Sequence, residues 1–183
     1  LVLAVDDVRI RNSCILCNVK TNGRIILAGE GSKVVGGLYR ARKGLDTFDL
    51  GSPNGIKTEI RFGQDYLVAD MIEAEEREIE KLKGLILAAD HAMGERSKIQ
   101  SELDRLRQDK VKMVKLLEKR SIRLFDLREK FEEHFSGAEV RVRGTVYPGV
   151  ILESHGRFHE VQARKARVVF TFDKAGRFVE KPL

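Results

Sequence analysis

Tryptophan is absent from this chain, and tyrosine and cysteine occur only three and two times in its 183 residues. Nucleic-acid-binding surfaces usually combine concentrated basic charge with exposed aromatic rings. Here the net charge of +6 is spread thinly over both ends of the sequence, so we expect no specific nucleic-acid partner. Two cysteines without a disulfide framework favour a reducing, cytoplasmic location.

The chain also lacks a run of about eighteen apolar residues, the length that a membrane-spanning helix requires. A basic and apolar leader segment is missing as well. We therefore predict no membrane span. The sequence starts at Leu1 without a methionine, and Val2 and Ala4 already follow an alternating pattern. We expect a fragment of a larger protein whose N-terminal part is missing.

Short β-like runs separated by glycine fill residues 5–63. The runs are residues 8–10, 14–19, 24–28, 33–35, 38–41 and 56–62. Larger units begin near Asp7, Gly23 and Gly44, a repeat of about twenty residues that is typical of a β-solenoid. In that fold, short strands joined by tight turns stack coil upon coil around an apolar core. An ordinary β-sandwich is the alternative.

Apolar residues at heptad spacing follow in two stretches. In the first stretch, residues 68–93, the only charged residue at a seam position is Glu75, and in the second, residues 99–131, the charged residues at seam positions are Lys110 and Arg120. Such patterns predict an antiparallel coiled-coil hairpin of two helices. Lys110 and Arg120 weaken the apolar core of the hairpin and are candidates for setting its register.

The tip of the hairpin is expected near residues 94–98, where Ser97 and Gln100 fit a capping box for the second helix. With this tip, the second helix would be about ten residues longer than the first, an overhang of roughly 15 Å. We divide the chain into β-helix coils at 1–65, the hairpin at 66–136, and final coils with capping strands at 137–183.

Glycine and proline positions mark the expected corners, because glycine adopts the positive φ angles that tight turns need. The residues assigned to structural turns are Gly36, Gly37, Gly51, Gly63, Gly144, Pro148 and Gly149. Basic residues flank the last β runs and are expected to block further pairing at the sheet edge. They are Lys165, Arg167, Lys174 and Lys181.

Four segments occur in an order that resembles the flagellar assembly protein A (FapA) family of bacterial cytoplasmic proteins. They are residues 35–41 (VGGLYRA), 50–52 (LGS), 58–63 (TEIRFG) and 143–150 (RGTVYPGV), with the helical hairpin between the last two. Phe62 stands where the family usually has valine. The resemblance implies a right-handed β-helix related in shape to the C-terminal domain of the division inhibitor MinC and to bactofilins. It implies no catalytic residues.

Motifs for metal or redox chemistry are weak. Cys14 and Cys17 have C-x-x-C spacing, but a zinc site needs two further ligands and a redox motif would open a helix, so we assign both a structural role. His155 and His159 are candidate metal ligands if they share a strand face, whereas Gly156 between them favours a corner. We predict no metal and no cofactor.

The sequence signal for the paired catalytic carboxylates of a carbohydrate-active β-helix is equally weak. The candidates are Asp6 with Asp7 and Asp46 with Asp49, but each pair points to opposite faces of an extended strand, so a solvated turn is the expectation. The glycines of residues 29–31 suggest a phosphate cradle, but no Gly-Lys-Ser/Thr follows. We predict that the chain is not an enzyme.

The two predicted helices differ in the sign of their charged residues, which suggests a binding surface. Residues 70–80 hold six acids and one base, and residues 105–123 hold eight bases and two acids. Pairing across the hairpin explains part of this contrast. The other hypothesis is that bases of the second helix bind an acidic partner. The candidate residues are Arg105, Arg107, Lys110, Lys112 and Lys115.

Three functions fit the sequence. The leading hypothesis, implied by the resemblance, is a non-enzymatic cytoplasmic scaffold that promotes or positions flagellum assembly by contacts with flagellar, polar-localisation or regulatory proteins, with recruitment to the cell pole. The second is a polymer- or dimer-forming element that associates through the coiled coil or the end of the β-helix. The third is a carbohydrate-active β-helix.

Overall fold

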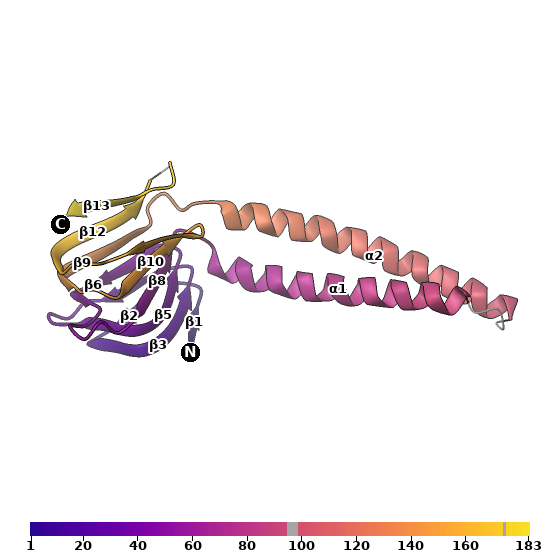
Figure 1. Cartoon of the computed structure of the whole chain (residues 1–183), viewed down its shortest axis with the longest axis horizontal. Helices are drawn as coiled ribbons and strands as arrows, with labels where there is room; N and C mark the ends of the chain where they lie inside the picture. The colour runs from indigo at the N-terminus through magenta and orange to yellow at the C-terminus, as the bar shows by residue number, and fades with distance from the viewer. Residues whose placement is uncertain (95–98, 174) are drawn as a thin grey trace. The chain divides into compact units, whose positions relative to one another are not determined.

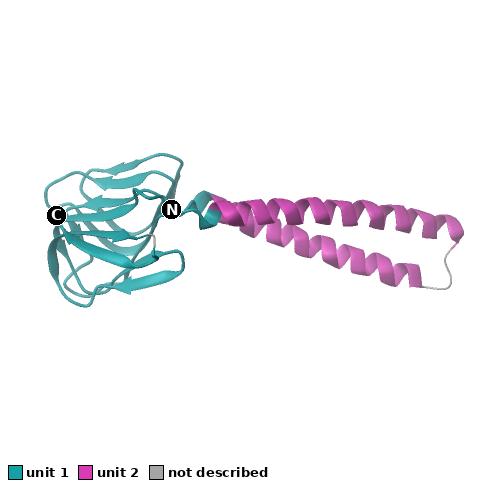
Figure 2. Ribbon diagram, turned by 90° about the horizontal axis from the view of Figure 1, so that it is seen from above, with its two compact units in different colours: residues 1–67, 131–183 teal, residues 68–130 magenta. Residues whose placement is uncertain are grey.

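The computed structural model describes residues 1–94, 99–173 and 175–183. Two compact units are present, residues 1–67 together with 131–183, and residues 68–130 (Figure 2). The first unit is a β-solenoid of about three turns, and the second consists of two helices inserted between its strands. The prediction of a β-solenoid with a helical insertion is therefore confirmed, and the β-sandwich alternative is wrong.

Thirteen strands lie in the described part of the first unit (Figure 1). They are β1 (Val2–Ala4), β2 (Val8–Ile10), β3 (Ser13–Thr21), β4 (Arg24–Leu27), β5 (Lys33–Ala41), β6 (Gly44–Thr47), β7 (Asp49–Leu50), β8 (Thr58–Phe62), β9 (Glu139–Val146), β10 (Val150–Ser154), β11 (Arg157–Glu160), β12 (Lys165–Phe172) and β13 (Phe178–Pro182). The helices are α1 (Tyr66–Gly94) and α2 (Gln100–Glu132).

Equivalent strands of successive coils form two parallel ladders. One ladder runs β1, β3, β5, β8 and β10, and the other runs β2, β4, β6 and β9. In the first ladder Cys14 pairs with Val34, and in the second Ile25 pairs with Leu45. Both pairs are twenty positions apart, so the repeat seen in the sequence is the length of one coil.

The segments before and after the helices belong to one stack. Strand β8, which precedes α1, lies parallel to both β5 and β10, and strand β9, which follows α2, lies parallel to β6. The coil that begins at β8 therefore continues at β9 after an interruption of more than seventy residues. Two neighbouring parallel strands need a long connection. The helical insertion lies within the connection between the parallel strands β8 and β10.

The last strands change direction. Strand β11 pairs antiparallel with β10, β12 pairs antiparallel with β9, and β13 pairs antiparallel with β12. Of the basic residues expected at this edge, Lys165 forms an ion pair with Glu180, and Lys181 lies on the outer strand β13. Lys174 lies outside the described residues.

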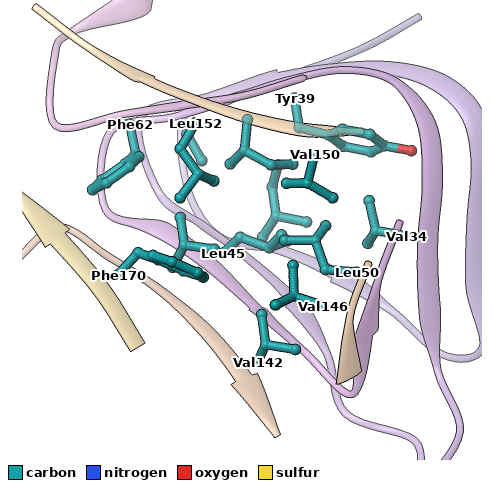
Figure 3. Close-up of a cluster of buried hydrophobic side chains, with 14 of the residues drawn as sticks. Val34, Tyr39, Leu45, Leu50, Phe62, Val142, Val146, Val150, Leu152 and Phe170 are labelled. Carbon is teal, nitrogen blue, oxygen red and sulfur yellow. The ribbon is translucent and has the colours of Figure 1, made fainter. Parts of the chain in front are cut away.

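Apolar side chains from both segments fill the interior of the solenoid. Figure 3 shows residues of early coils, such as Val34, Tyr39 and Leu45, gathered with residues that follow the helices, such as Val142 and Phe170. All five are completely buried. Because burying one such side chain contributes roughly 1.5–3 kcal/mol, the shared core holds the two halves of the interrupted stack together.

Three of the glycines assigned to turns lie inside strands instead. Gly36 and Gly37 are in β5, which joins the two runs predicted at 33–35 and 38–41, and Gly144 is in β9. At Gly37 φ is 91°, and a Cβ atom would lie 2.1 Å from the carbonyl oxygen of Cys17. The glycine thus allows the neighbouring coil to approach closely without a break in the strand.

The other assigned turn residues lie next to strands. Gly51 and Gly63 each directly follow a strand and have φ angles of 81° and 96°. Pro148 and Gly149 lie between β9 and β10, where the φ angle of Gly149 is 87°. These positive angles are the conformations that a side chain would disfavour.

The two helices run antiparallel within the second unit. Glu75 pairs with Arg120, whereas Asp90, further along α1, pairs with Lys110, further back along α2. Helix α1 has 29 residues and α2 has 33, so the predicted ten-residue difference in length is wrong. Neither helix, in the described residues, is apolar enough to cross a membrane. The predicted tip and the capping box at Ser97 lie outside the described residues.

Candidate interaction surfaces

The seam of the hairpin follows the heptad pattern closely. On α1 the buried seam residues include Ile79, Leu82 and Ala89, and on α2 Leu127 is buried. The other apolar seam positions within the two helices are half-buried or buried. Ile99 is different, because 69% of its surface is exposed, and its assignment to the seam is therefore wrong.

The charged residues within the seam bind one another. Glu75 is only 6% exposed, and its carboxylate accepts hydrogen bonds from Arg120 Nη1 at 2.8 Å and lies 3.2 Å from Arg123 Nε. The other seam cation, Lys110, forms an ion pair with Asp90. Buried carboxylates require such partners, so these pairs fix which residues of α1 and α2 lie opposite each other.

The five bases proposed to bind a partner have different surroundings. Lys110 forms its ion pair with Asp90 across the hairpin. Arg107 pairs with Asp104 at 3.2 Å and Lys112 pairs with Asp109 at 3.1 Å, each within α2. Arg105 and Lys115 are exposed, and neither makes an ion pair within the part of the chain that the structure describes.

Several large apolar side chains of the hairpin lie outside its seam, and they are between 43% and 62% exposed. They are Met71, Leu85, Leu87, Val111, Val114, Leu116, Ile122 and Phe125. Sequence reasoning missed them because it followed only the seam positions. Their signal was present, since apolar residues outside the seam positions of a coiled coil are unusual on a helix that water surrounds.

A shallow groove lies beside the seam at one of these residues. Phe125 is 62% exposed and borders the groove, whose volume is about 520 Å³. Ile79 and Leu124 contribute apolar surface to it, and the ion pair between Glu76 and Arg128 (2.7 Å) lies at its edge. This mixture of apolar floor and charged edge is common at protein–protein contacts.

A histidine pair lies in the first unit, next to the residues where the helices leave and rejoin it. His134 Nδ1 and His155 Nε2 are 2.9 Å apart, and both rings contact Phe172. Burial, followed by the charge of His155, lowers the pKa of His134 from its ordinary value of 6.5. Gln64 binds this region too, since its amide nitrogen donates to the Phe131 carbonyl at 3.2 Å.

The metal site considered at His155 and His159 does not form. His155 faces His134, whereas His159 contacts the rings of Phe170 and Phe178. Within residues 1–94, 99–173 and 175–183, no three histidine, cysteine or acidic residues are grouped to hold a metal ion. Sequence reasoning did not find the pair with His134, because that residue lies in the connection between α2 and β9, outside every helix or strand pattern.

The cysteines are both free thiols in strand β3. Cys14 is buried, and burial is the main cause that raises the pKa of its thiol to about 11. The hydroxyl of Tyr39 donates to the Cys14 carbonyl oxygen at 3.1 Å. A thiol with so high a pKa is a poor nucleophile and a poor metal ligand at neutral pH.

Carboxylates considered for catalysis accept hydrogen bonds from backbone nitrogens or from neighbouring basic side chains. Asp46 and Asp49 lie on strands β6 and β7, so the expectation of a solvated turn was wrong for this pair, whereas Asp6 and Asp7 are exposed between β1 and β2. Asp46 accepts from Arg143 Nε at 3.1 Å, and Asp49 accepts from the Thr145 backbone nitrogen at 2.7 Å. Through these hydrogen bonds, the two carboxylates link neighbouring coils of the solenoid.

Comparison with known proteins places the chain in a family. The family model described as the Flagellar Assembly Protein A beta solenoid domain matches residues 1–177. The chain belongs to the FapA family. No curated protein and no solved structure matched the chain.

The motifs that resemble FapA sequences all lie on the solenoid stack. Residues 35–41 are in β5, and residues 50–52 start at the last residue of β7. Residues 58–63 are β8 with the glycine that follows it, and residues 143–150 run from β9 into β10. In each of these segments a glycine has its neighbours packed closely around it, as at Gly63, where an added Cβ would lie 2.6 Å from the His134 ring. The FapA motifs are therefore the residues that let coils stack. Membership of the family associates the chain with flagellar assembly.

Proposed function

We propose that this chain acts in flagellar assembly as a non-enzymatic scaffold, with the β-solenoid as a stable body and the helical hairpin as the element that binds another protein. The observation that carries the proposal is the surface of the hairpin. It bears apolar side chains that are about half exposed, and α2 adds two bases, Arg105 and Lys115, without ion pairs in the described residues. Apolar and unpaired basic groups together suit an acidic protein partner.

The solenoid suits the role of a body. Its core is continuous across the point of insertion, and residues on both sides of the helices, such as Leu45 and Val140, are completely buried. Parallel coils joined by a shared core resist local opening. We place the role in the cytoplasm, where two free cysteines persist as thiols, with recruitment to the cell pole as the finer hypothesis.

Replacement of residues 68–130 by a short glycine–serine linker tests the role of the hairpin. The β-rich circular dichroism spectrum and a cooperative thermal transition of the solenoid should remain. In the bacterium that encodes the chain, the number of assembled flagella should fall, as counted by electron microscopy. A normal number of flagella with this variant would refute the role of the hairpin.

A pair of variants of α2 tests whether its basic side chains bind the partner. The variant Arg105→Glu, Lys112→Glu, Lys115→Glu reverses three exposed charges, and we expect it to reduce flagellation. The matched control Arg105→Lys, Lys112→Arg, Lys115→Arg keeps every charge and should behave as the native chain does. If both variants are equally defective, side-chain geometry at these positions matters and the proposal of charge recognition fails.

A further inference from the structure

Two long faces flank the seam of the hairpin, one on each side. The first contains the ion pair between Glu76 and Arg128. The second contains Glu78 and Arg123, which pair with the seam residues Arg120 and Glu75. Positions spaced by three, four or seven residues from these lie on the same face of a helix, so the remaining residues can be assigned to one face or the other.

The two faces carry opposite charge. The first has six acids, Glu73, Glu76, Glu80, Asp90, Asp104 and Glu118, against the three bases Lys83, Arg107 and Arg128. The second has six bases, Lys81, Arg105, Lys112, Lys119, Arg123 and Lys130, against the four acids Glu78, Glu102, Asp109 and Asp126. We call them the acidic face and the basic face.

Each face also has an exposed apolar pair at the same level along the hairpin. The ion pair between Asp90 and Lys110 shows that residues whose numbers add to about 200 lie opposite each other. By this rule Leu87 and Val114 lie together on the acidic face, where they are 60% and 45% exposed. Leu85 and Leu116 lie together on the basic face, where they are 56% and 43% exposed. These two pairs differ by about 3 Å along the helix axis.

We propose that the occupant of these faces is a second copy of this chain, with the acidic face of one hairpin packed on the basic face of the other. This contact brings the two apolar pairs together, because both lie at nearly the same level along the hairpin. Acids such as Glu80 and Glu118 then lie near bases such as Lys81 and Lys119. The four helices form a bundle with an apolar centre and charged margins, the usual arrangement of stable helical interfaces.

The charge pattern also decides the symmetry of the contact. A two-fold dimer would place identical faces together and would bring six acids against six acids, or six bases against six bases. Packing of unlike faces avoids this repulsion, and it leaves one acidic and one basic face free at the ends. Association of this kind is open-ended, so the average mass should continue to rise with concentration beyond that of a dimer.

Charge reversal on the full chain tests the proposal. An acidic-face variant, Glu80→Lys, Asp104→Lys, Glu118→Lys, has six bases and three acids on that face. A basic-face variant, Lys81→Glu, Lys112→Glu, Lys119→Glu, has seven acids and three bases on its altered face. Each variant therefore has two faces of the same sign. Sedimentation velocity over a range of protein concentrations, at about 0.05 M and about 0.5 M salt, measures the average mass.

Four results are expected. The native chain associates at low salt and less at high salt, each variant alone is monomeric, and an equimolar mixture of the two variants associates again, because it supplies both signs. The control Arg77→Glu, Lys115→Glu, Glu129→Lys changes only outward positions and associates as the native chain does. Helical circular dichroism confirms that all variants fold.

A native chain that remains monomeric at every concentration overturns the proposal, and in that case the faces serve another protein. It is equally overturned if both variants associate alone or if their mixture remains monomeric. The inference does not depend on the flagellar partner, since a chain that is monomeric and yet needs its hairpin for flagellation would retain the proposed function and lose only this contact.

Discussion

The ion pair within the seam allows a sharp test of how the hairpin is held together. The carboxylate of Glu75 is nearly inaccessible to water, with 6% of the residue exposed, and it binds Arg120 at 2.8 Å. Replacement of Arg120 by leucine keeps an apolar stem in the seam but leaves the carboxylate without its main partner. Replacement of both residues by leucine removes the buried charges together.

The two changes should have opposite consequences. Removal of one partner of a fully buried ion pair typically costs about 3–5 kcal/mol, because an uncompensated charge remains. Arg123 stays 3.2 Å from the carboxylate of Glu75, and the Arg120 side chain is 29% exposed, so we expect Arg120→Leu to cost about 2–3 kcal/mol. The double variant Glu75→Leu, Arg120→Leu should be at least as stable as the native chain, since two well-packed leucines often replace such a pair without loss.

Urea denaturation followed by helical circular dichroism measures both effects, because the helices supply most of that signal. Arg77→Leu is the matched control, since Arg77 pairs with Glu73 at 3.8 Å while both side chains are 68% exposed. An exposed pair of this kind contributes about 0.5 kcal/mol or less. Equal costs for Arg120→Leu and Arg77→Leu would show that burial of Glu75 has no energetic effect. A double variant less stable than Arg120→Leu alone would contradict the account of the uncompensated charge.

Three further predictions concern the solenoid. Gly44→Ala should destabilise it by about 2–4 kcal/mol in urea denaturation, because a Cβ there would lie 1.9 Å from the Glu139 carbonyl oxygen at a φ of 95°. Phe170→Ala should cost about 3–5 kcal/mol, since that ring is completely buried, whereas Phe158→Ala, at a residue 66% exposed, should cost less than about 0.5 kcal/mol. The midpoint temperature of thermal unfolding should fall as the pH is lowered below about 6.5. The reason is that the pKa of His134 is lower in the folded chain than in the unfolded chain, so that the unfolded chain binds the proton more strongly.

Controls separate these effects from general damage. Gly31→Ala has a similar φ of 71° but no atom within 4 Å of the added Cβ, so it should cost clearly less than the change at Gly44. His134→Gln should flatten the pH dependence of the thermal transition between pH 6.5 and the lowered pKa. An unchanged pH profile in that variant would mean that another group is responsible.

Periodicity explains why the fold could be predicted from the sequence. The twenty-residue repeat and the two heptad seams each arise from residues that are close in sequence, and burial of Ile79 and Leu82 on one side and of Val34 and Leu50 on the other follows directly from these patterns. The heptads did not reveal the faces beside the seam. Assignment of these faces needs the register between the helices, which the ion pair of Glu75 with Arg120 fixes.

Predictions from local patterns failed where a second coil decides the conformation. Gly36 and Gly37 look like a turn when the residues around them are read alone, and both have positive φ angles, yet pairing with Cys17 in the adjacent coil keeps them within one strand, β5. Asp46 looks like a turn acid, yet Arg143, which follows nearly a hundred residues later, binds it on a strand. In both cases the partner is distant in sequence and adjacent in space.

The class of each segment could be predicted from the amino-acid sequence alone, because solenoid strands and coiled-coil helices each produce a short period of apolar residues within one stretch of chain. Contacts between residues far apart in the chain, such as that of His134 with His155, became visible only in the folded structure, as did the two charged faces of the hairpin. The physical reason is that a period specifies which side chains share a face, whereas the element that covers that face is chosen by packing across long sequence separations.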